Sequence, residues 1–441
     1  MFSLPRTATA PFCPSEVKGS IVIGAGLPLH KKLLRYAGPG LLISVGYMDP
    51  GNWATDIESG SRFGYGLLFV VLLASLAAML LQTLCVRLGI VAQKDLARAC
   101  REHYPMWANR FLWLSAELAI VATDLAEVLG SALALHLLLG ISVPAGIGIT
   151  AFDTLLVLGL QGAGFRRVEA IVLALVTTIA GCFVIELAMS PPLWFGVDGA
   201  LMGFVPSLER LQQPGALYLA IGIVGATVMP HNLYLHSSVV QTRRVAATDD
   251  GQREALRFAT LDAVASLSLA FLVNAAIMML AASAFNASGN RAVTDIAGAY
   301  RLIEPVVGSA LAATLFAIAL LASGQSSTFT GTIAGQVIME GFLNLKIPCW
   351  QRRVITRGLA LGPAFLGVWL LGDAGVGKLL VLSQVVLSFQ LPFAIWPLIR
   401  FTSSRTVMGL WVNGPVVKVL AWGLLLLISV ANAWLAWALL F

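Results

Sequence analysis

The sequence reads Asp49-Pro50-Gly51-Asn52 in one apolar segment and Met229-Pro230-His231-Asn232 in another, and both segments are long enough to cross a membrane. A carboxylate, a thioether, an imidazole and amides at membrane depth are stable only where they face protein or enclose something polar. Two interrupted apolar helices, one in each half of a chain, are typical of secondary transporters that bind near the middle of the membrane. The two motifs therefore predict both the fold and the position of a binding site.

Each motif contains a proline that breaks its helix. Proline has no N–H to donate, and its ring clashes with the carbonyl four residues earlier. Pro50 is therefore expected to free the carbonyl of Gly46, and Pro230 that of Ala226. Freed carbonyls beside a carboxylate and a thioether offer the ligands that a transition-metal ion accepts.

The composition indicates a polytopic membrane protein. Of the 441 residues, 58% are hydrophobic and 11% are charged, whereas about 25% are charged in a typical soluble protein. We predict an all-α chain with eleven spans of the ~20 residues or more that a crossing needs: 37–60, 64–91, 108–137, 144–164, 168–190, 216–242, 258–285, 305–343, 354–371, 377–400 and 417–441. The span over 305–343 is too long for one perpendicular helix, so we expect it to be tilted or to extend into the cytoplasm.

The distribution of basic residues predicts the orientation. With a cytoplasmic N-terminus, the outer side carries few of the 28 Lys and Arg, namely Arg62, Arg210, Arg291, Arg301 and Lys378. This is a positive-inside pattern, so the net charge of +6 reports topology and not nucleic-acid binding. An odd number of spans then places the C-terminus outside, in a multi-pass protein of the cytoplasmic membrane.

The two halves of the chain predict an internal repeat. Residues 1–30 have no convincing apolar signal-peptide core, so we interpret residues 1–36 as a cytoplasmic tail. Five spans lie in 37–190 and five in 216–400, and an odd number per half inverts the second half. The transporter domain, 37–441, is therefore expected to be a five-plus-five inverted repeat with an added helix over 417–441. Five scattered cysteines without a CxxC spacing argue against disulfides and thiolate clusters.

Three side chains of the motifs are candidate metal ligands. An ionised carboxylate such as Asp49 is costly in mid-membrane and is usually functional; a structural ion pair is the alternative. Asn52 offers a neutral oxygen, and it could equally cap the second half-helix. Met229 supplies a soft thioether, which favours Mn2+, Fe2+ or Co2+ over Mg2+ and Ca2+, although Met is more often core filler.

Further polar residues at membrane depth are candidates for other roles. His231 follows Met229 by two positions, so its side chain should leave the metal on another face, and an imidazole titrates near neutral pH, which suits proton transfer. His236 lies nearer the cytoplasm and is either a second proton carrier or structural. Gln384 offers an oxygen able to complete the metal shell. For Asp153 only a helix contact is predicted.

Three carboxylates lie along the third span. The spacing of Glu117, Asp124 and Glu127 places them on one helical stripe, and such a stripe in a membrane favours a proton route. The alternative is that they pair with Arg352 and Arg353 at the start of the ninth span. A salt-bridge network that also moves protons satisfies both interpretations.

These motifs resemble the Nramp (natural resistance-associated macrophage protein) family of divalent-metal transporters, and its bacterial manganese branch most closely. The stretches that carry the resemblance are Gly46-Tyr47-Met48-Asp49-Pro50-Gly51-Asn52, Met229-Pro230-His231, Leu235-His236-Ser237-Ser238, Ala122-Thr123-Asp124-Leu125-Ala126-Glu127 and Arg352-Arg353. The resemblance implies a LeuT-type fold and proton-coupled transport of Mn2+ or Fe2+, with no separate cofactor.

The resemblance also implies roles for single residues. The family's metal ligands carry over to the side chains of Asp49, Asn52, Met229 and Gln384 and to the carbonyls of Gly46 and Ala226. Its proton-coupling residues carry over to Asp124, Glu127 and His231. Family members without the methionine carry harder ions such as Mg2+ or Al3+, and this chain retains it.

Two other classes of membrane protein share some of these features. An intramembrane metalloprotease expects His-Glu-x-x-His, a spacing not found among His30, His103, His136, His231 and His236. An amino-acid transporter of the same fold would bind a carboxylate at a half-helix N-terminus, where Asp49 would repel it. We therefore predict a transporter and not an enzyme, working with a divalent metal ion, protons and the lipid bilayer and without an obligate protein partner.

Overall fold

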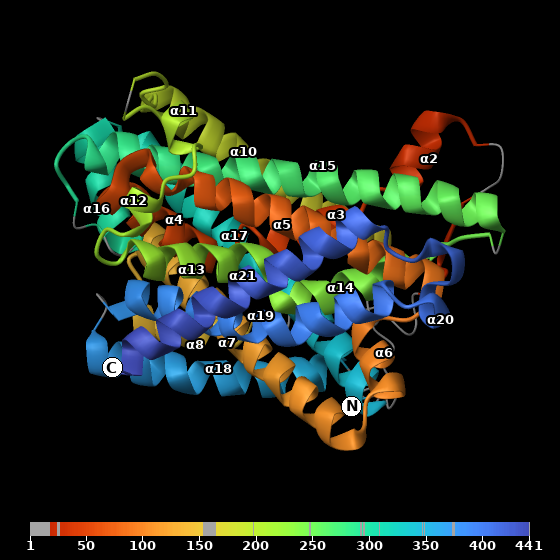
Figure 1. Cartoon of the computed structure of the whole chain (residues 1–441). Coiled ribbons are helices and arrows are strands. Elements are labelled where there is room, and N and C mark those ends of the chain that lie inside the picture. Colours follow the sequence, from red (N-terminus) through yellow and green to blue (C-terminus); the bar gives the residue numbers. More distant parts are fainter. Residues whose placement is uncertain are drawn as a thin grey trace, which may run out of the picture.

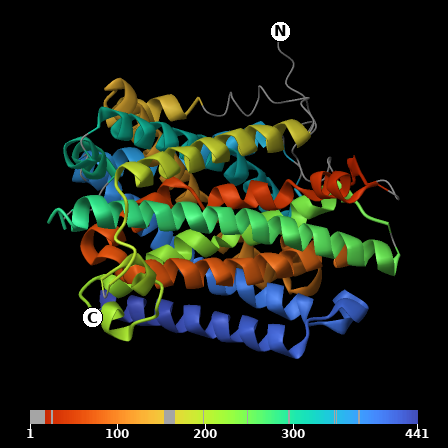
Figure 2. The same ribbon diagram turned by 90° about the horizontal axis from the view of Figure 1, so that it is seen from above.

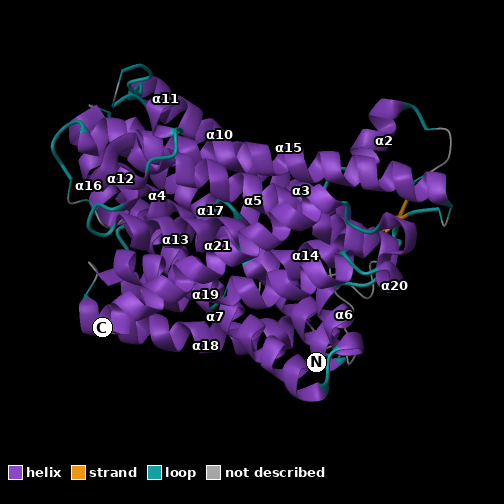
Figure 3. Cartoon of the chain, in the orientation of Figure 1, coloured by secondary structure: helices purple, strands orange, loops and turns teal. Residues whose placement is uncertain are grey.

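The computed structural model describes residues 18–23, 27–152, 165–196, 198–246, 248–291, 293, 296–307, 309–345, 347, 349–372 and 375–440. Over these ranges the chain is helical apart from loops and one pair of two-residue strands (Figures 1 and 3). The long helices run along roughly one direction (Figure 2). Nine helices in the described ranges are long and apolar enough to cross a membrane. The predicted all-α, multi-span class is confirmed.

The elements of the first half are β1 (Ile21–Val22), α2 (Leu29–Tyr36), α3 (Pro39–Gly46), α4 (Pro50–Phe63), η1 (Gly64–Leu67), α5 (Leu68–Arg87), η2 (Leu88–Ala92), α6 (Leu96–His103), α7 (Met106–Leu139), α8 (Val143–Thr150), α10 (Phe165–Met189), α11 (Ala200–Gly203) and α12 (Leu208–Leu211). Those of the second half are α13 (Ala216–Val228), α14 (Pro230–Val239), η3 (Val240–Thr242), β2 (Arg243–Arg244), α15 (Asp249–Ala281), η4 (Ala282–Asn286), α16 (Ile296–Val307), α17 (Ala310–Leu343), α18 (Cys349–Leu371), α19 (Gly375–Thr402), α20 (Arg405–Met408), η5 (Gly409–Trp411) and α21 (Pro415–Leu440).

Both predicted helix breaks are present. Helix α3 ends at Gly46 and α4 begins at Pro50, while α13 ends at Val228 and α14 begins at Pro230. Each proline occupies the first position of the second half-helix, where its missing N–H needs no partner. Each broken helix therefore leaves backbone polar groups without helical partners inside the bundle.

The difference between eleven predicted spans and nine long helices has two sources. The first two predicted spans meet in one continuous helical stretch, Pro50–Ala92, which is counted as a single membrane-spanning helix. Most of the predicted span over 144–164 falls on residues 153–164, which lie outside the described residues, as does Asp153. Helix α8 covers only the beginning of that span.

The prediction of one helix over 305–343 is wrong at its start. Residues up to Val307 belong to α16, and α17 begins at Ala310. Ser309 is the N-cap of α17, because its hydroxyl accepts a hydrogen bond from the backbone N–H of Leu311 (3.2 Å). A serine in this position satisfies a free N–H of the first turn and so favours a new helix start.

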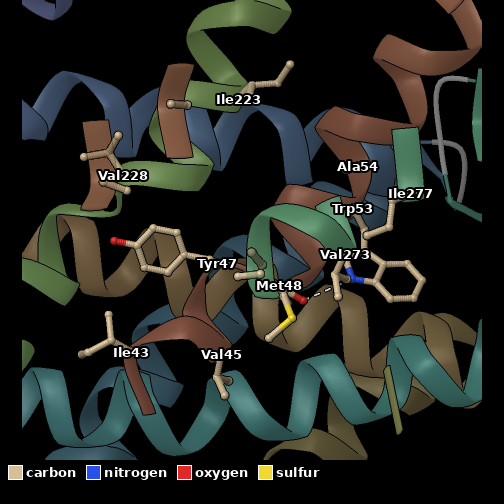
Figure 4. Close-up of a cluster of buried hydrophobic side chains, with 14 of the residues drawn as sticks. Ile43, Val45, Tyr47, Met48, Trp53, Ala54, Ile223, Val228, Val273 and Ile277 are labelled. Carbon is tan, nitrogen blue, oxygen red and sulfur yellow. Dashed lines mark hydrogen bonds between the residues drawn. The ribbon is translucent and has the colours of Figure 1, made fainter. Parts of the chain in front are cut away.

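Trp53 anchors the helix that follows the first break. Its ring packs edge-on against Phe183 of α10 (centroids 4.8 Å apart) and Phe316 of α17 (5.2 Å). Its Nε1 donates a hydrogen bond to the carbonyl of Met48 (3.1 Å), which Figure 4 shows as a dashed line. Edge-to-face aromatic contacts add to the stabilisation from burial. The start of α4 is thereby fixed against two other helices.

The two ends of the bundle differ in their elements (Figure 1). Helices α2, α6 and α20 lie at one end, called the α2 end below, where β1 and β2 form a short parallel pair. Helices α11, α12 and α16 lie at the opposite end, called the α16 end. Helix α21 terminates at the α16 end, so the described N-terminal residues and the C-terminal helix end lie on opposite sides of the bundle.

Candidate metal site

Asp49 caps the second half of the first broken helix. Its Oδ1 accepts hydrogen bonds from the backbone N–H of Asn52 (2.8 Å) and from Asn52 Nδ2 (2.7 Å). A helix N-terminus carries partial positive charge, so it stabilises a carboxylate placed there. Asp49 Oδ2 is buried and has no hydrogen-bond partner among the described residues. An acceptor left in this state is costly unless a cation binds it.

Met229 alone separates the halves of the second broken helix. Its φ of 39° and ψ of 100° lie in a region that side-chain-bearing residues rarely adopt. Its sulfur lies close to the end of α3, because a Cβ added at Gly46 would lie 3.1 Å from Sδ. Asn232 Nδ2 also donates to this sulfur (3.5 Å). The glycine therefore lets the thioether approach the end of α3.

The two breaks meet at the side-chain amide of Asn52. Its Nδ2 donates to Asp49 Oδ1 (2.7 Å), to the carbonyl of Ala226 (3.0 Å) and to the carbonyl of Gly46 (3.5 Å). All three acceptors belong to the predicted ligand set. Three oxygens of the candidate ligand set therefore converge on one NH2 group. For Asn52 to act as an oxygen ligand, its amide must turn so that Oδ1 faces this point.

The oxygen of the Asn52 amide is held by residues that the sequence analysis missed. Thr227 Oγ1 donates to Asn52 Oδ1 (3.5 Å), and so does Asn274 Nδ2 (3.3 Å). Asn274 Nδ2 also donates to the carbonyl of Tyr47 (2.7 Å), which lies inside the first break. Asn274 comes from the C-terminal third of α15, where no local motif marks it.

Gln384 approaches the site from α19. Its side chain lies against Gly51, where an added Cβ would overlap the amide group. Its Nε2 donates to Ser383 Oγ (2.8 Å), while its Oε1 is buried and without a hydrogen-bond partner in the described part of the chain. An oxygen ligand from α19 is therefore available beside the first turn of α4.

The site is closed to solvent. Asp49, Ala226 and Met229 are 0% exposed and Asn52 is 1% exposed. Over the described ranges, no three His, Cys, Asp or Glu side chains gather in a way that could hold a metal ion. The candidate site is thus of a different kind, with one carboxylate, amide and backbone oxygens, and a thioether.

Glu117, the first of the three carboxylates on α7, forms an ion pair with one of the two arginines that the sequence suggests. Glu117 Oε2 lies 2.6 Å from Nη2 of Arg352 on α18. Its Oε1 accepts a hydrogen bond from Trp113 Nε1 (3.0 Å). The side chain of Arg353 lies outside the described residues.

The other end of the stripe meets an arginine that the sequence analysis did not identify. Glu127 Oε2 lies 3.9 Å from Nη2 of Arg357, and both side chains are buried. Thr328 Oγ1 of α17 donates to the same carboxylate (3.3 Å). Asp124 is also buried, at 1% exposure. Arg357 sits within an apolar predicted span, so only the packing of α18 on α7 reveals its partner.

His231 faces α7 and not the point where the oxygens converge. Its Nδ1 lies 3.2 Å from Thr123 Oγ1. His236 instead belongs to a chain of side-chain hydrogen bonds that connects it to Tyr47 of the first break. Its Nδ1 lies 2.9 Å from Gln82 Oε1, and Gln82 Nε2 donates to the hydroxyl of Tyr47 (2.8 Å). Sequence reasoning did not find Gln82 or the Tyr47 hydroxyl.

A charged cavity lies at the α2 end, beside α14. It has a volume of about 300 Å3, and its walls include Lys18, Asp95, Arg98, Ser238 and Glu340. Burial, followed by the charge of Arg98, lowers the pKa of Lys18, and burial raises the pKa of Asp95. The ε-amino group of Lys18 donates to the carbonyl of Gln93 (3.0 Å).

The fold defines the class of protein first. The structure superimposes on Mhp1, a nucleobase-cation-symport-1 family transporter, with a TM-score of 0.61 at 16% identity, covering 99% of this chain and 97% of that one. It also matches MhsT with a TM-score of 0.57 at 14% identity, covering 89% and 98%. At these identities the likeness concerns the fold alone, and the fold is that of the LeuT-type transporters.

Sequence comparison then gives the family. The model of the Nramp family (natural resistance-associated macrophage protein-like) matches residues 40–438, so the chain belongs to the Nramp family. The divalent metal cation transporter MntH of Ralstonia nicotianae is 64% identical over 438 residues, covering 99% of this chain and 98% of the relative. MntH 1 of Pseudomonas aeruginosa is 64% identical over 431 residues, covering 98% of each. The Eremococcus coleocola manganese transporter superimposes with a TM-score of 0.88 at 39% identity, covering 95% and 89%.

Proposed function

We propose that this chain imports divalent transition-metal ions, Mn2+ or Fe2+, across the cytoplasmic membrane together with protons, by alternating access. The observation that carries the proposal is the convergence of Asp49 Oδ1 and the carbonyls of Gly46 and Ala226 on the buried amide nitrogen of Asn52, with the sulfur of Met229 close to Gly46. The names of the relatives, divalent metal cation transporter and manganese transporter, support the same substrate class.

The donor set argues for selectivity among divalent ions. Mg2+ and Ca2+ prefer shells made of oxygen alone, whereas a thioether suits softer ions. Asp49 is the one charged group among the proposed ligands. The rest of the dication's charge must therefore be balanced by the dipoles of the neutral ligands. Mn2+ and Fe2+ both accept such a mixed shell.

Release toward the α2 end requires movement of α3. Asp262 of α15 accepts hydrogen bonds from the backbone N–H groups of Gly38 (3.2 Å) and Gly40 (2.7 Å). Arg243, which follows η3, pairs with Glu169 of α10 (2.8 Å) and donates to the carbonyl of Ala37, just before α3 (2.6 Å). Because these contacts hold the start of the first half-helix against α10 and α15, we expect them to break when the site opens at this end.

Protons are proposed to take a route separate from that of the metal. His231 contacts α7 at Thr123, and the stripe of Asp124 and Glu127 continues from there. Arrival of a dication at Asp49 disfavours positive charge nearby, so a proton is driven onto α7. Asp124→Asn should abolish metal-stimulated proton flux and leave Mn2+ binding measurable. Intravesicular pH and isotopic Mn2+ recorded in the same liposomes test this, and loss of binding would contradict it.

The proposed orientation places the α2 end in the cytoplasm and the C-terminus outside. Helices α2, α6 and α20, which share this end, carry Lys31, Lys32, Arg35, Arg98, Arg101 and Arg405. This follows the positive-inside rule. The repeat boundaries at 37–190 and 216–400 belong to the same proposal. Labelling of single cysteines placed at residues 33 and 438 with an impermeant reagent distinguishes the two faces.

The deciding experiment is uptake by proteoliposomes. With acidic medium outside, the protein should accumulate labelled Mn2+, and Fe2+, Co2+ and Cd2+ should compete while Ca2+ does not. The second candidate, an amino-acid transporter, is suggested by the shared fold with MhsT, which was crystallised with L-phenylalanine. Uptake of labelled amino acids without Mn2+ uptake would reject the metal-transport proposal.

A further inference from the structure

A narrow apolar cavity lies where α21 packs against the rest of the bundle. It has a volume of about 180 Å3 and lies between α5, α13, α19 and α21, with Ala74, Ile221, Val224, Ser388, Ile428 and Ala431 in its walls. Its rim includes Leu73 and Leu427, which are 49% and 66% exposed on the outer surface of the bundle. Since these helices are long and apolar enough to span a membrane, the opening faces lipid.

Water is a poor occupant of this cavity. Among the described residues of its wall, Ser388 has the one polar side chain, and its hydroxyl already donates to Asn432 Oδ1 (2.8 Å). Asn432 Nδ2 in turn donates to the carbonyl of Ser388 (2.6 Å). A buried water needs two to four polar partners, and this wall leaves none unsatisfied. The occupant must therefore be apolar.

The packing of the helices around the cavity excludes a helix from another chain. Helix α21 is in contact with α5, α13 and α19, the three other helices that form the cavity. The crevice between them is therefore narrower than the ~10 Å that an α-helix with side chains occupies. A single hydrocarbon chain is thin enough to enter, and the bilayer supplies such chains at the rim.

We propose that this cavity, the α21 slot, binds one acyl chain of a membrane phospholipid. Leu211 of α12 and Leu217 at the start of α13 also line it, so the chain comes from the leaflet at the α16 end. Val224 lies two residues before Ala226 on α13, and Ser388 lies one turn after Gln384 on α19. The bound chain therefore packs against both helices that carry candidate metal-site groups. An effect of the bound chain on metal transport rests on the proposed function, whereas the binding of lipid itself does not.

The test of binding uses the full-length protein in liposomes that contain phosphatidylglycerol with a photoactivatable diazirine on one acyl chain. In the unmodified protein, we expect labelling of α13 and α5 residues that line the slot, mapped by mass spectrometry of peptides. Ala431→Phe should fill the slot and reduce this labelling at least fivefold. Ala433→Phe is the matched control, because Ala433 lies on the same helix and is exposed to lipid, and it should leave the labelling unchanged.

A second substitution, Ala74→Leu, fills the slot from the opposite wall and should also reduce the labelling. It provides the test if Ala431→Phe disturbs folding. Equal labelling in both plugged variants and the control would overturn the proposal, as would cross-links between two copies of the protein in place of lipid adducts. In parallel, initial Mn2+ uptake should vary with acyl-chain length in the unmodified protein and become independent of it in Ala431→Phe. Absence of Mn2+ uptake in every protein would reject the transport proposal and leave the lipid result standing.

Discussion

The two broken helices interrupt the backbone in different ways. Three residues, Tyr47 to Asp49, separate α3 from α4, whereas Met229 alone separates α13 from α14. Asp49 has an extended, relaxed conformation (φ −70°, ψ 165°) and its carboxylate caps α4. Met229 is held at a positive φ. The first break therefore supplies charge on a helix cap, and the second supplies a soft atom on a strained residue.

This difference separates affinity from selectivity. The charge of Asp49 acts on any cation, because Coulomb attraction does not depend on ligand softness. The sulfur of Met229 discriminates among cations through its polarisability. Substitutions in the first break should therefore weaken all metals together, and substitutions in the second should change their order.

Asp49→Asn should have the largest effect. Removing one partner of a buried charge interaction costs about 3–5 kcal/mol, so the Kd for Mn2+ and for Cd2+ should rise by more than about a hundredfold. Calorimetric titration of the purified protein measures both constants. Asp56→Asn is the matched control, because Asp56 is a second buried carboxylate on α4. Comparable losses in the two variants would show that Asp49 has no special contact with metal.

Gly46→Ala should disturb both breaks at once. The added Cβ would overlap Asn232 Nδ2 and lie 3.1 Å from the sulfur of Met229, so both side chains must shift away from the end of α3. We expect the Kd for all divalent ions to rise by tenfold or more. Gly423→Ala on α21, where an added Cβ meets nothing within 4 Å, should bind metal normally. Unchanged binding in Gly46→Ala would mean that the breaks do not form one site.

Substitution of Met229 should change selectivity more than affinity. Met229→Ala and Met229→Gly both remove the sulfur, so each should weaken Cd2+ binding about tenfold and let Ca2+ compete for uptake. Only glycine relieves the positive φ, a strain of about 1 kcal/mol or more. Met229→Gly should therefore melt at a higher temperature than Met229→Ala. If both variants keep Cd2+ affinity and Ca2+ exclusion, the methionine serves packing alone.

Asn232→Ala should have the smallest effect. It removes two long hydrogen bonds, one to the Met229 sulfur (3.5 Å) and one to the carbonyl of Ile43 (3.5 Å), and a neutral hydrogen bond contributes about 0.5–1.5 kcal/mol. Cd2+ affinity should fall a few-fold while Mn2+ affinity stays within twofold, as measured in one competition titration. An equal loss of affinity for both ions would show that Asn232 supports the backbone of the break and does not orient the sulfur.

The features that follow from local chemistry could be predicted from the sequence. Pro50 and Pro230 determine where the helices break, since proline acts on its own helix. The freed ends at Gly46 and Ala226 follow from the same rule, and their convergence is visible once the halves are packed. The pairing of Glu117 with Arg352 was one of the alternatives left open, and the ion pair is present.

The features that depend on packing between distant segments could not be predicted. Arg357 meets Glu127 only because α18 lies along α7. Asn274 reaches Asn52 across 222 residues of sequence, and one amide in a long apolar helix carries no local signal of a partner. The interruption before Ala310 was missed because an apolar stretch resembles one long helix, whereas the cap at Ser309 acts through a single hydrogen bond.

The side-chain amide of Asn52 has a consequence for the transport cycle without cargo. A carrier must return empty after each delivery, and an uncompensated carboxylate in hydrocarbon would oppose that return. The NH2 group of Asn52 donates to one of the two oxygens of Asp49, so the unloaded protein satisfies part of this carboxylate internally. We expect Asn52→Asp to lose this resting state, because two carboxylates would then face each other. Such a protein would still exchange internal for external Mn2+ but would stall in net accumulation, which turns a pump-like symporter into an exchanger.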